Sequence, residues 1–288
     1  MRLVPILVLG VALASGCGDD SSDAAADGQA QVVVTHSILG DVVQSVVGDE
    51  IDVEVVMPPG VDPHEFAPSS RQVEAMSDAD LLVINGAGFE AGLDGAIGAA
   101  TDAGVELFTF ADHIALLDED PHFWTDPSRM ATAVEALATA LVGAGVAADH
   151  ADEYAADLRA LDRDLGDALA AIPADRRVLV TNHEVFGYFA DRYDFDVLGT
   201  VIPANTTQAE PSAADLDDLA DTIRQTGVPA IFAETSSSAN LADALADSVG
   251  DIEVVELFSE SLGDDGSGAE TYIEMMRTNT ERVAEALG

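Results

Sequence analysis

Short runs of β-branched and aliphatic residues alternate with amphipathic stretches along most of the chain, and this alternation constrains the fold more than any other feature. The runs predicted to form strands are residues 31–35, 52–57, 81–85, 178–181, 230–233 and 253–258. Helical patterns at 38–47 and at about 69–77 lie between the first three runs. Strands that alternate with helices form parallel sheets. We therefore expect an α/β fold with two lobes, each built on a mainly parallel sheet flanked by helices.

A single long helix is predicted between the two halves. Residues 148–172 contain no proline. The apolar residues that recur there at helical spacing are Tyr154, Leu158, Leu161, Leu165 and Leu169. We expect a rigid linking helix over 148–173 that joins an amino-terminal lobe (31–147) to a carboxy-terminal lobe (174–288). A helical hairpin packed on one domain is the alternative.

The amino terminus has the composition of an export signal. Arg2 is followed by a short apolar run that ends in small residues before Cys17, and this run is too short to persist as a membrane-spanning helix. The residues before Cys17 resemble the processing box of bacterial lipoproteins, which implies cleavage before Cys17 and lipidation of its sulfur. We expect residues 1–17 to be a lipoprotein signal peptide and residues 18–30, which are small, polar and acidic, to be a flexible tether.

The charge balance excludes two classes of partner. The 288 residues carry 54 acidic and 11 basic side chains, a formal net charge of −43, and every basic residue is Arg. A nucleic-acid-binding protein needs a basic face to displace counterions, and binding to anionic lipid through side chains needs a polybasic patch. Neither can be assembled from this composition. The single cysteine also excludes an internal disulfide.

Three of the six histidines share one structural context. His64 lies in a loop after a predicted strand, His122 lies just before a capped helix, and His183 follows the strand at 178–181. In open α/β sheets, ligands bind at the carboxyl ends of the strands. Neutral imidazole is the commonest side-chain ligand of borderline divalent cations. These three histidines are therefore predicted metal ligands.

A fourth ligand is expected from the loop after the last strand. Glu260 is nearest to the strand end, whereas Asp264 or Asp265 would require the loop to fold back, and water is a further alternative. Three imidazoles and one carboxylate complete a tetrahedral shell that suits Zn²⁺, while Mn²⁺ generally takes more oxygen donors. His36, after the first strand, is a reserve ligand. The histidines predicted not to bind metal are His113 and His150.

A zinc hydrolase is the alternative from another functional class. Its metal would need an open coordination position and a general base beside bound water. The sequence contains no His-Glu-x-x-His pattern and no Gly-x-Ser-x-Gly elbow. We therefore expect a binding protein and not an enzyme.

Several motifs in the same order resemble the zinc/manganese solute-binding proteins of ABC transporters. Besides the lipoprotein start, these motifs are Pro63–Phe66, Asp120–Pro127, Asn182–Phe189 and Ile231–Glu234. The resemblance runs from about residue 31 to 288. It implies two lobes joined by one long helix, with a cleft between the lobes that holds the metal. His64 and His122 would come from the amino-terminal lobe, and His183 and Glu260 from the carboxy-terminal lobe.

Two further segments, Pro203–Pro211 and Gly268–Tyr272, resemble the zinc-specific branch found with chaperone-assisted importers. Manganese-type members usually have a carboxylate where this chain has His183, and Glu260 stands where the family often has Asp. The His-rich acidic loop of many zinc members is missing, because residues 112–120 are few and hold a single histidine.

The resemblance also implies a function. We expect a monomeric lipoprotein, anchored through Cys17 to the outer face of the cytoplasmic membrane, that captures Zn²⁺ and delivers it to an ABC permease and its ATPase. A periplasmic metallochaperone is a further expected partner. A manganese-specific binding protein of the same family is the alternative. Glu234, at the end of a predicted strand, is expected to orient the ring of a ligating histidine.

Overall fold

The computed structural model describes residues 30–250 and 252–288. The predicted signal peptide and nearly all of the predicted tether lie outside the described residues. Within the described ranges, no helix combines the length and apolarity needed to span a bilayer.

The amino-terminal lobe is built on a parallel four-stranded sheet with the strand order β2-β1-β3-β4. The strands are β1 (Val32–His36), β2 (Val53–Met57), β3 (Leu81–Ile84) and β4 (Glu106–Thr109). All five residues of the central strand β1 are buried, as expected where helices cover both faces of a parallel sheet. Val32 pairs with Val53 on one side and with Leu81 on the other.

The carboxy-terminal lobe repeats this architecture with the strand order β6-β5-β7-β8, again with every pair parallel. The strands are β5 (Val178–Thr181), β6 (Asp196–Thr200), β7 (Ala230–Glu234) and β8 (Glu253–Leu257). The predicted α/β fold with one parallel sheet in each half is confirmed. The strand predictions did not include β4 and β6, which are edge strands that begin with Glu106 and Asp196 and so lack a continuous apolar run.

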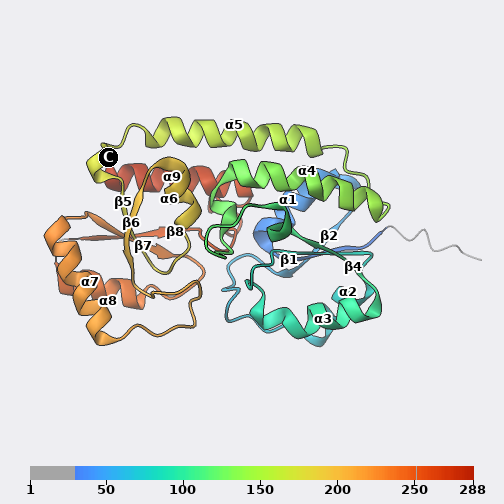
Figure 1. Cartoon of the computed structure of the whole chain (residues 1–288), viewed down its shortest axis with the longest axis horizontal. Helices are drawn as coiled ribbons and strands as arrows, with labels where there is room; N and C mark the ends of the chain where they lie inside the picture. The colour runs from blue at the N-terminus through green and yellow to red at the C-terminus, as the bar shows by residue number, and fades with distance from the viewer. Residues whose placement is uncertain (1–29, 251) are drawn as a thin grey trace, which may run out of the picture.

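Nine helices of the described residues flank the two sheets. They are α1 (Ser37–Val47), α2 (Ser70–Asp78), α3 (Asp94–Ala103), α4 (Pro127–Gly143), α5 (Ala151–Leu169), α6 (Gly187–Tyr193), α7 (Ala213–Thr226), α8 (Asn240–Val249) and α9 (Tyr272–Leu287). Figure 1 shows α2 and α3 below the first sheet, α7 and α8 below the second, and α5 running along the top of both lobes. The chain passes from the first sheet to the second through α4 and α5 (Figure 1).

Helix α5 is shorter than the predicted span of 148–173. It begins after His150, whose N–H donates to the carbonyl of Val46 in α1, so the preceding residues form a turn and not a helix. It ends at Leu169, whose carbonyl accepts the N–H of Ile172 just before Pro173 closes off any extension.

The apolar stripe of α5 is buried against helices of both lobes. Leu158 and Leu161 are fully or almost fully buried, and α5 packs along both α4 and α9. One continuous apolar core runs from the first sheet through these helices to Leu179 and Phe258 of the second lobe. Helix α5 is therefore part of an apolar core that includes residues of both halves of the chain.

Candidate metal centre

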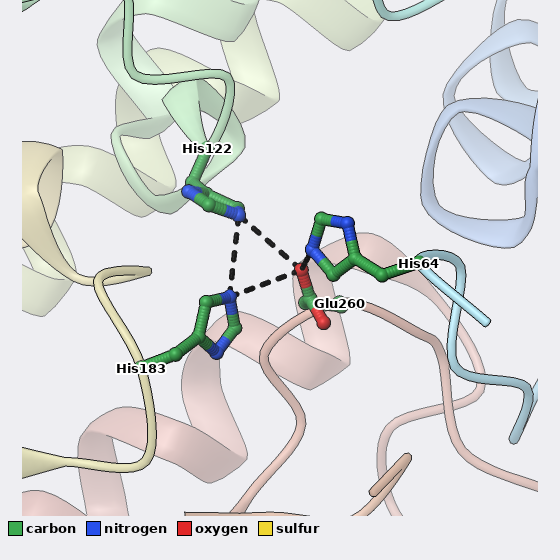
Figure 2. A group of neighbouring side chains, drawn as sticks. All are labelled: His64, His122, His183 and Glu260. Carbon is green, nitrogen blue, oxygen red and sulfur yellow. Dashed lines mark hydrogen bonds and ion pairs between the residues drawn. The ribbon is translucent and has the colours of Figure 1, made fainter. Parts of the chain in front are cut away.

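The structure brings His64, His122, His183 and Glu260 together between the two lobes (Figure 2). His64 lies in the loop after β2, and His122 lies between β4 and α4. His183 follows β5, and Glu260 follows β8. Each side chain thus comes from the carboxyl end of a parallel strand or from the start of a helix, and one nitrogen or oxygen from each lies within 4.8 Å of the others.

The spacing of the donor atoms suits a small tetrahedral cation. Glu260 Oε1 lies 3.2 Å from His122 Nε2 and 3.2 Å from His183 Nε2, and the two imidazole nitrogens are 3.4 Å apart. A tetrahedron with bonds of the length that Zn²⁺ makes to nitrogen has edges of about 3.3 Å. The pair His64 Nε2 and Glu260 Oε1 is closer, at 2.7 Å, which is a hydrogen bond.

The cluster is closed off from solvent. His122, His183 and Glu260 are at most 1% exposed, and His64 is 9% exposed. Two cavities, of about 550 and 420 Å³, have walls from both lobes, and none of the four clustered side chains lines either of them. The expected cleft between the lobes is therefore shut over the four side chains.

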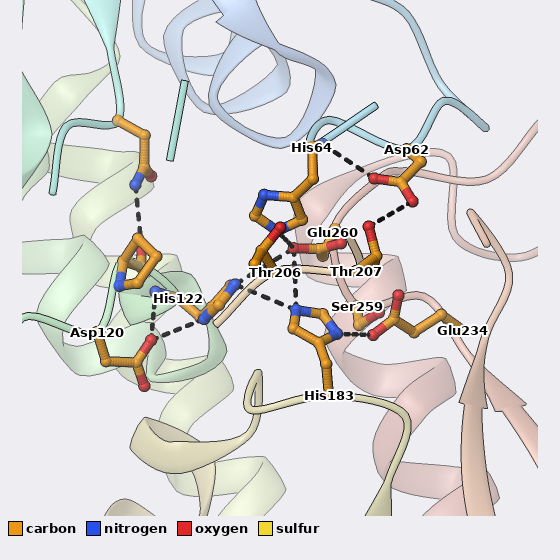
Figure 3. Close-up of polar contacts among 12 residues, drawn as sticks. Asp62, His64, Asp120, His122, His183, Thr206, Thr207, Glu234, Ser259 and Glu260 are labelled. Atoms are coloured by element: carbon orange, nitrogen blue, oxygen red, sulfur yellow. Dashed lines mark hydrogen bonds and ion pairs between the residues drawn. The ribbon is translucent and has the colours of Figure 1, made fainter. Parts of the chain in front are cut away.

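Two of the four side chains are positioned by the same short motif, Asp-Pro-His. Asp62 Oδ1 accepts the backbone N–H of His64 at 2.9 Å, and Asp120 Oδ1 accepts the backbone N–H of His122 at 2.9 Å. Asp120 Oδ1 also lies 2.7 Å from His122 Nδ1 (Figure 3). This contact assigns a proton to Nδ1, so Nε2 of His122 is the nitrogen that faces the cluster.

His183 is oriented by Glu234, the last residue of β7. The Nδ1 atom of His183 donates to Glu234 Oε1, while Ser237 Oγ donates to Glu234 Oε2 at 3.3 Å. The carboxylate is therefore held from both sides, and Figure 3 shows its contact with the His183 ring. Nε2 of His183 then faces the other three donors, which is the arrangement expected for Glu234 from the sequence.

Glu234→Gln should weaken Zn²⁺ binding by about 10–100-fold, because carboxylates that hold a ligating imidazole contribute that much to metal affinity. The amide keeps the shape of the side chain but removes the negative charge that makes the His183 imidazole a stronger ligand for the metal. Competition titration with a zinc chelator measures the change. Glu184→Gln, at an exposed carboxylate beside the same histidine, is the control and should bind like the wild type. Equal affinities for the two variants would show that Glu234 does not support the site.

Opposite charges hold the cluster together. Burial by itself raises the pKa of Glu260, but the neighbouring imidazoles, His183 first, bring it well below the ordinary value of 4.5. Burial lowers the pKa of His183, and the carboxylates of Glu260 and Glu234 outweigh burial and raise it to about 10. The pKa of His122 is also raised, because Asp120 and Glu260 overcome its burial. The buried carboxylates therefore favour positive charge at the imidazoles.

The remaining candidates lie apart from the cluster. The ring of His36 packs between Phe89 and Trp124, and burial lowers the pKa of His36 to about 3. Its ring nitrogens find no hydrogen-bond partner among the described residues, but it does not join the four donors, so the reserve assignment was wrong. His113 and His150, which were predicted not to bind metal, also lie outside the cluster. The alternative ligands Asp264 and Asp265 lie outside it as well.

Two side chains of the carboxy-terminal lobe, Tyr188 and Thr207, make three cross-lobe hydrogen bonds that were not predicted from the sequence. Tyr188 of α6 donates its hydroxyl to the carbonyl of Asp120 at 2.7 Å and accepts the N–H of Leu117 at 3.0 Å. Thr207 Oγ1 donates to Asp62 Oδ2 at 2.8 Å. The repeat of Asp-Pro-His at 62–64 and 120–122 could have indicated from the sequence that the two aspartates position the histidines. Nothing in the spacing of the sequence pointed to Tyr188 or Thr207.

Two parallel α/β lobes that close over three imidazoles and one carboxylate define a metal-binding protein of the two-lobed solute-binding class. Such a protein buries its ligand between the lobes, and the donor atoms here face one another and not an open substrate pocket.

Comparison with known proteins gives the family. The family model described as "ZnuA: Zinc-uptake complex component A periplasmic" matches residues 32–286. The protein named zinc-binding protein TroA, from Treponema pallidum, is 32% identical over an alignment of 299 positions that covers 98% of this chain and 96% of that protein. The manganese-binding lipoprotein MntA of Halalkalibacterium halodurans is 30% identical over 285 residues, which cover 96% and 94%. The chain therefore belongs to this family of metal ABC transporter substrate-binding lipoproteins.

The fold agrees with that assignment. The solved structure of periplasmic zinc-binding protein TroA from Treponema pallidum superposes with a TM-score of 0.82 and 31% identity, covering 91% of this chain and all of that one. The prediction of a binding protein, and not an enzyme, is confirmed by the family.

Proposed function

We propose that this chain captures Zn²⁺ between its lobes and delivers it to the permease of an ABC importer. The observation that carries the proposal is the convergence of His64, His122 and His183 Nε2 with Glu260 Oε1, with three of the spacings between 3.2 and 3.4 Å. Zn²⁺ is the cargo of this site and not a resident cofactor.

The chemistry of the donors supports a cation. Among the atoms of the described residues, Glu260 Oε2 is buried and has no hydrogen-bond partner, and a buried carboxylate oxygen without one is costly. A divalent ion bound at Oε1 would offset the charge of the whole carboxylate. The buried imidazoles of His122 and His183 would at the same time exchange a bound proton for the metal.

The balance of nitrogen and oxygen donors supports zinc over manganese. Three imidazoles and one carboxylate form a four-coordinate set that Zn²⁺ accepts, whereas Mn²⁺ favours oxygen-rich sites of higher coordination number. The names of the relatives include both metals. The choice therefore depends on the donors of this chain.

The family supports the proposed location and the proposed transporter partners. Relatives are named lipoproteins of metal ABC transporters, which supports an exported protein tethered to the outer face of the cytoplasmic membrane through Cys17. A permease and its ATPase are then the recipients of the metal. A periplasmic metallochaperone would supply zinc in place of the missing His-rich loop. We propose a monomer as the working form.

Equilibrium competition between Zn²⁺ and Mn²⁺ for the metal-free protein tests the choice of metal. We expect one zinc ion per chain and nearly complete occupancy by zinc at equal free concentrations of the two ions. Equal occupancy by the two metals would contradict the zinc assignment and favour a manganese-binding protein.

A further inference from the structure

The segment that carries Glu260 follows a strand of the carboxy-terminal lobe, yet it is hydrogen-bonded to the amino-terminal lobe. Trp124 Nε1 donates to the carbonyl of Ser259 at 2.7 Å. Gly60 N–H donates to Ser261 Oγ at 2.8 Å and lies 3.3 Å from the carbonyl of Leu262. Both residues that flank Glu260 thus have partners on the opposite lobe.

Two serine hydroxyls form the centre of this contact. Ser37 Oγ, at the start of α1, accepts the N–H of Leu262 at 3.1 Å and lies 3.3 Å from Ser261 Oγ. Ser37 is 5% exposed and Ser261 is 2% exposed. We use the name serine clasp for four groups: the hydroxyls of Ser37 and Ser261 and the N–H groups of Gly60 and Leu262.

The serine clasp joins two loops that carry donors of the metal centre. Gly60 lies in the loop that leads from β2 to His64, and Ser261 is next to Glu260. The bond from Gly60 N–H to Ser261 Oγ therefore fixes the spacing of these loops, and the 2.7 Å contact between His64 Nε2 and Glu260 Oε1 depends on that spacing.

The neighbours of His183 are held differently. The carbonyl of Asn182 accepts the N–H of Ile202 at 2.8 Å, Thr181 Oγ1 donates to the carbonyl of His183 at 2.8 Å, and Glu234 accepts from its ring. These partners all belong to the carboxy-terminal lobe. The groups that hold His183 thus lie in its own lobe, whereas Glu260 is flanked by hydrogen bonds to the opposite lobe, which carries His64 and His122.

We infer that Ser37 and Ser261 are positioning residues for metal binding, which hold Glu260 on the amino-terminal lobe so that His64, His122 and Glu260 form one preassembled three-donor unit. This inference rests on the proposed function, because it concerns how the zinc site is organised. Without the serine clasp, the Glu260 segment occupies other positions in the metal-free protein. The apparent affinity then falls by the fraction of molecules in which Glu260 is in place.

The test compares two serines on either side of Glu260. Ser261→Ala removes a hydroxyl of the serine clasp, whereas Ser259→Ala removes a buried hydroxyl that has no hydrogen-bond partner among the described residues. We expect Ser261→Ala to raise the Kd for Zn²⁺ about tenfold, as for a competent fraction of about one in ten, and Ser259→Ala to leave it unchanged. Ser37→Ala is the second clasp variant and should resemble Ser261→Ala.

A double-mutant cycle distinguishes positioning from a general loss of stability. If the serine clasp acts through Glu260, Ser261→Ala has no further effect on zinc affinity in a Glu260→Ala background. The visible absorption of bound Co²⁺ is the second readout, since a displaced carboxylate changes the ligand field. We expect an altered Co²⁺ spectrum for Ser261→Ala and a wild-type spectrum for Ser259→Ala.

Equal zinc affinities and Co²⁺ spectra for Ser261→Ala, Ser37→Ala and Ser259→Ala would overturn the inference. An additive effect of Ser261→Ala in the Glu260→Ala background would also overturn it. Both outcomes leave the proposed function intact, because that function fails only if the wild-type chain does not bind Zn²⁺.

Discussion

Glu260→Gln should raise the Kd for Zn²⁺ by roughly 100-fold or more. A protein zinc site is worth about 10–16 kcal/mol, so the loss of one anionic donor in four corresponds to about 3 kcal/mol, or roughly 100-fold in Kd. The amide keeps the volume of the side chain but supplies no negative charge to the cation. Glu260 Oε1 also lies within 3.2 Å of a nitrogen from each of the three histidines. Its substitution therefore affects the contacts of the whole cluster.

Asp264→Asn is the matched control for this variant. Asp264 follows Glu260 in the same loop and was an alternative ligand from the sequence, but its side chain is exposed and lies outside the cluster. Its substitution should leave zinc affinity unchanged. Chelator competition on the two variants, with circular dichroism to establish that both fold, measures the difference. A large loss for Asp264→Asn and none for Glu260→Gln would reverse the ligand assignment.

Zinc affinity should fall steeply as the pH is lowered from 7.5 to 5. Glu260 and Glu234 overcome burial and raise the pKa of His183 to about 10 in the metal-free protein, so zinc must displace a proton from this ring at neutral pH. Each displaced proton lowers the affinity about tenfold per pH unit. The raised pKa of His122 acts in the same direction.

Titrations of Kd against pH and calorimetry in buffers of different ionisation enthalpy measure this proton release directly. We expect at least one proton to be released per zinc bound at pH 7.5. In the His183→Ala variant, the pH dependence should become shallower because one displaced proton is lost. A Kd that stays constant from pH 7.5 to 5 would contradict metal binding by these imidazoles.

The stability of the metal-free protein should show the opposite dependence. The folded-state pKa of His183 is above its ordinary value of 6.5. The stability that this group contributes is therefore fully present below pH 6.5 and is lost as the pH rises through about 10. Glu260, whose pKa is depressed, contributes stability above about pH 4.5 that is lost under acid. Raising the pH above 6.5 thus weakens the attraction between the His183 imidazole and its carboxylate neighbours in the metal-free protein. The same rise in pH strengthens zinc binding.

The local pattern of the sequence was sufficient to predict one parallel sheet in each half, and its candidate ligands included all four clustered residues. Parallel strands place their carboxyl ends at one edge of each sheet, so His64 could be assigned to the ligand-binding edge of the first sheet and His183 to that of the second. The apolar stripe with Leu158 and Leu161 likewise predicted the linking helix. These features depend on neighbours in the sequence, which is why a single chain reveals them.

The contacts that orient the donors could not be predicted in the same way. Ser37 and Ser261 are 224 positions apart, and Tyr188 and Asp120 are 68 apart. Their pairing depends on how the two lobes close. No periodicity or motif in the sequence predicts how the lobes close. His36 shows the converse error, because its place after a strand suggested a ligand, while its ring is buried among aromatic residues of the core.

The most direct test of the zinc site is an anomalous difference map at the zinc edge from crystals grown with one equivalent of Zn²⁺. We expect one dominant peak, bound by Nε2 of His64, His122 and His183 and by a carboxylate oxygen of Glu260, at about 2.0–2.2 Å from each. A dominant peak at another place in the chain, or a zinc ion held without these histidines, would contradict it.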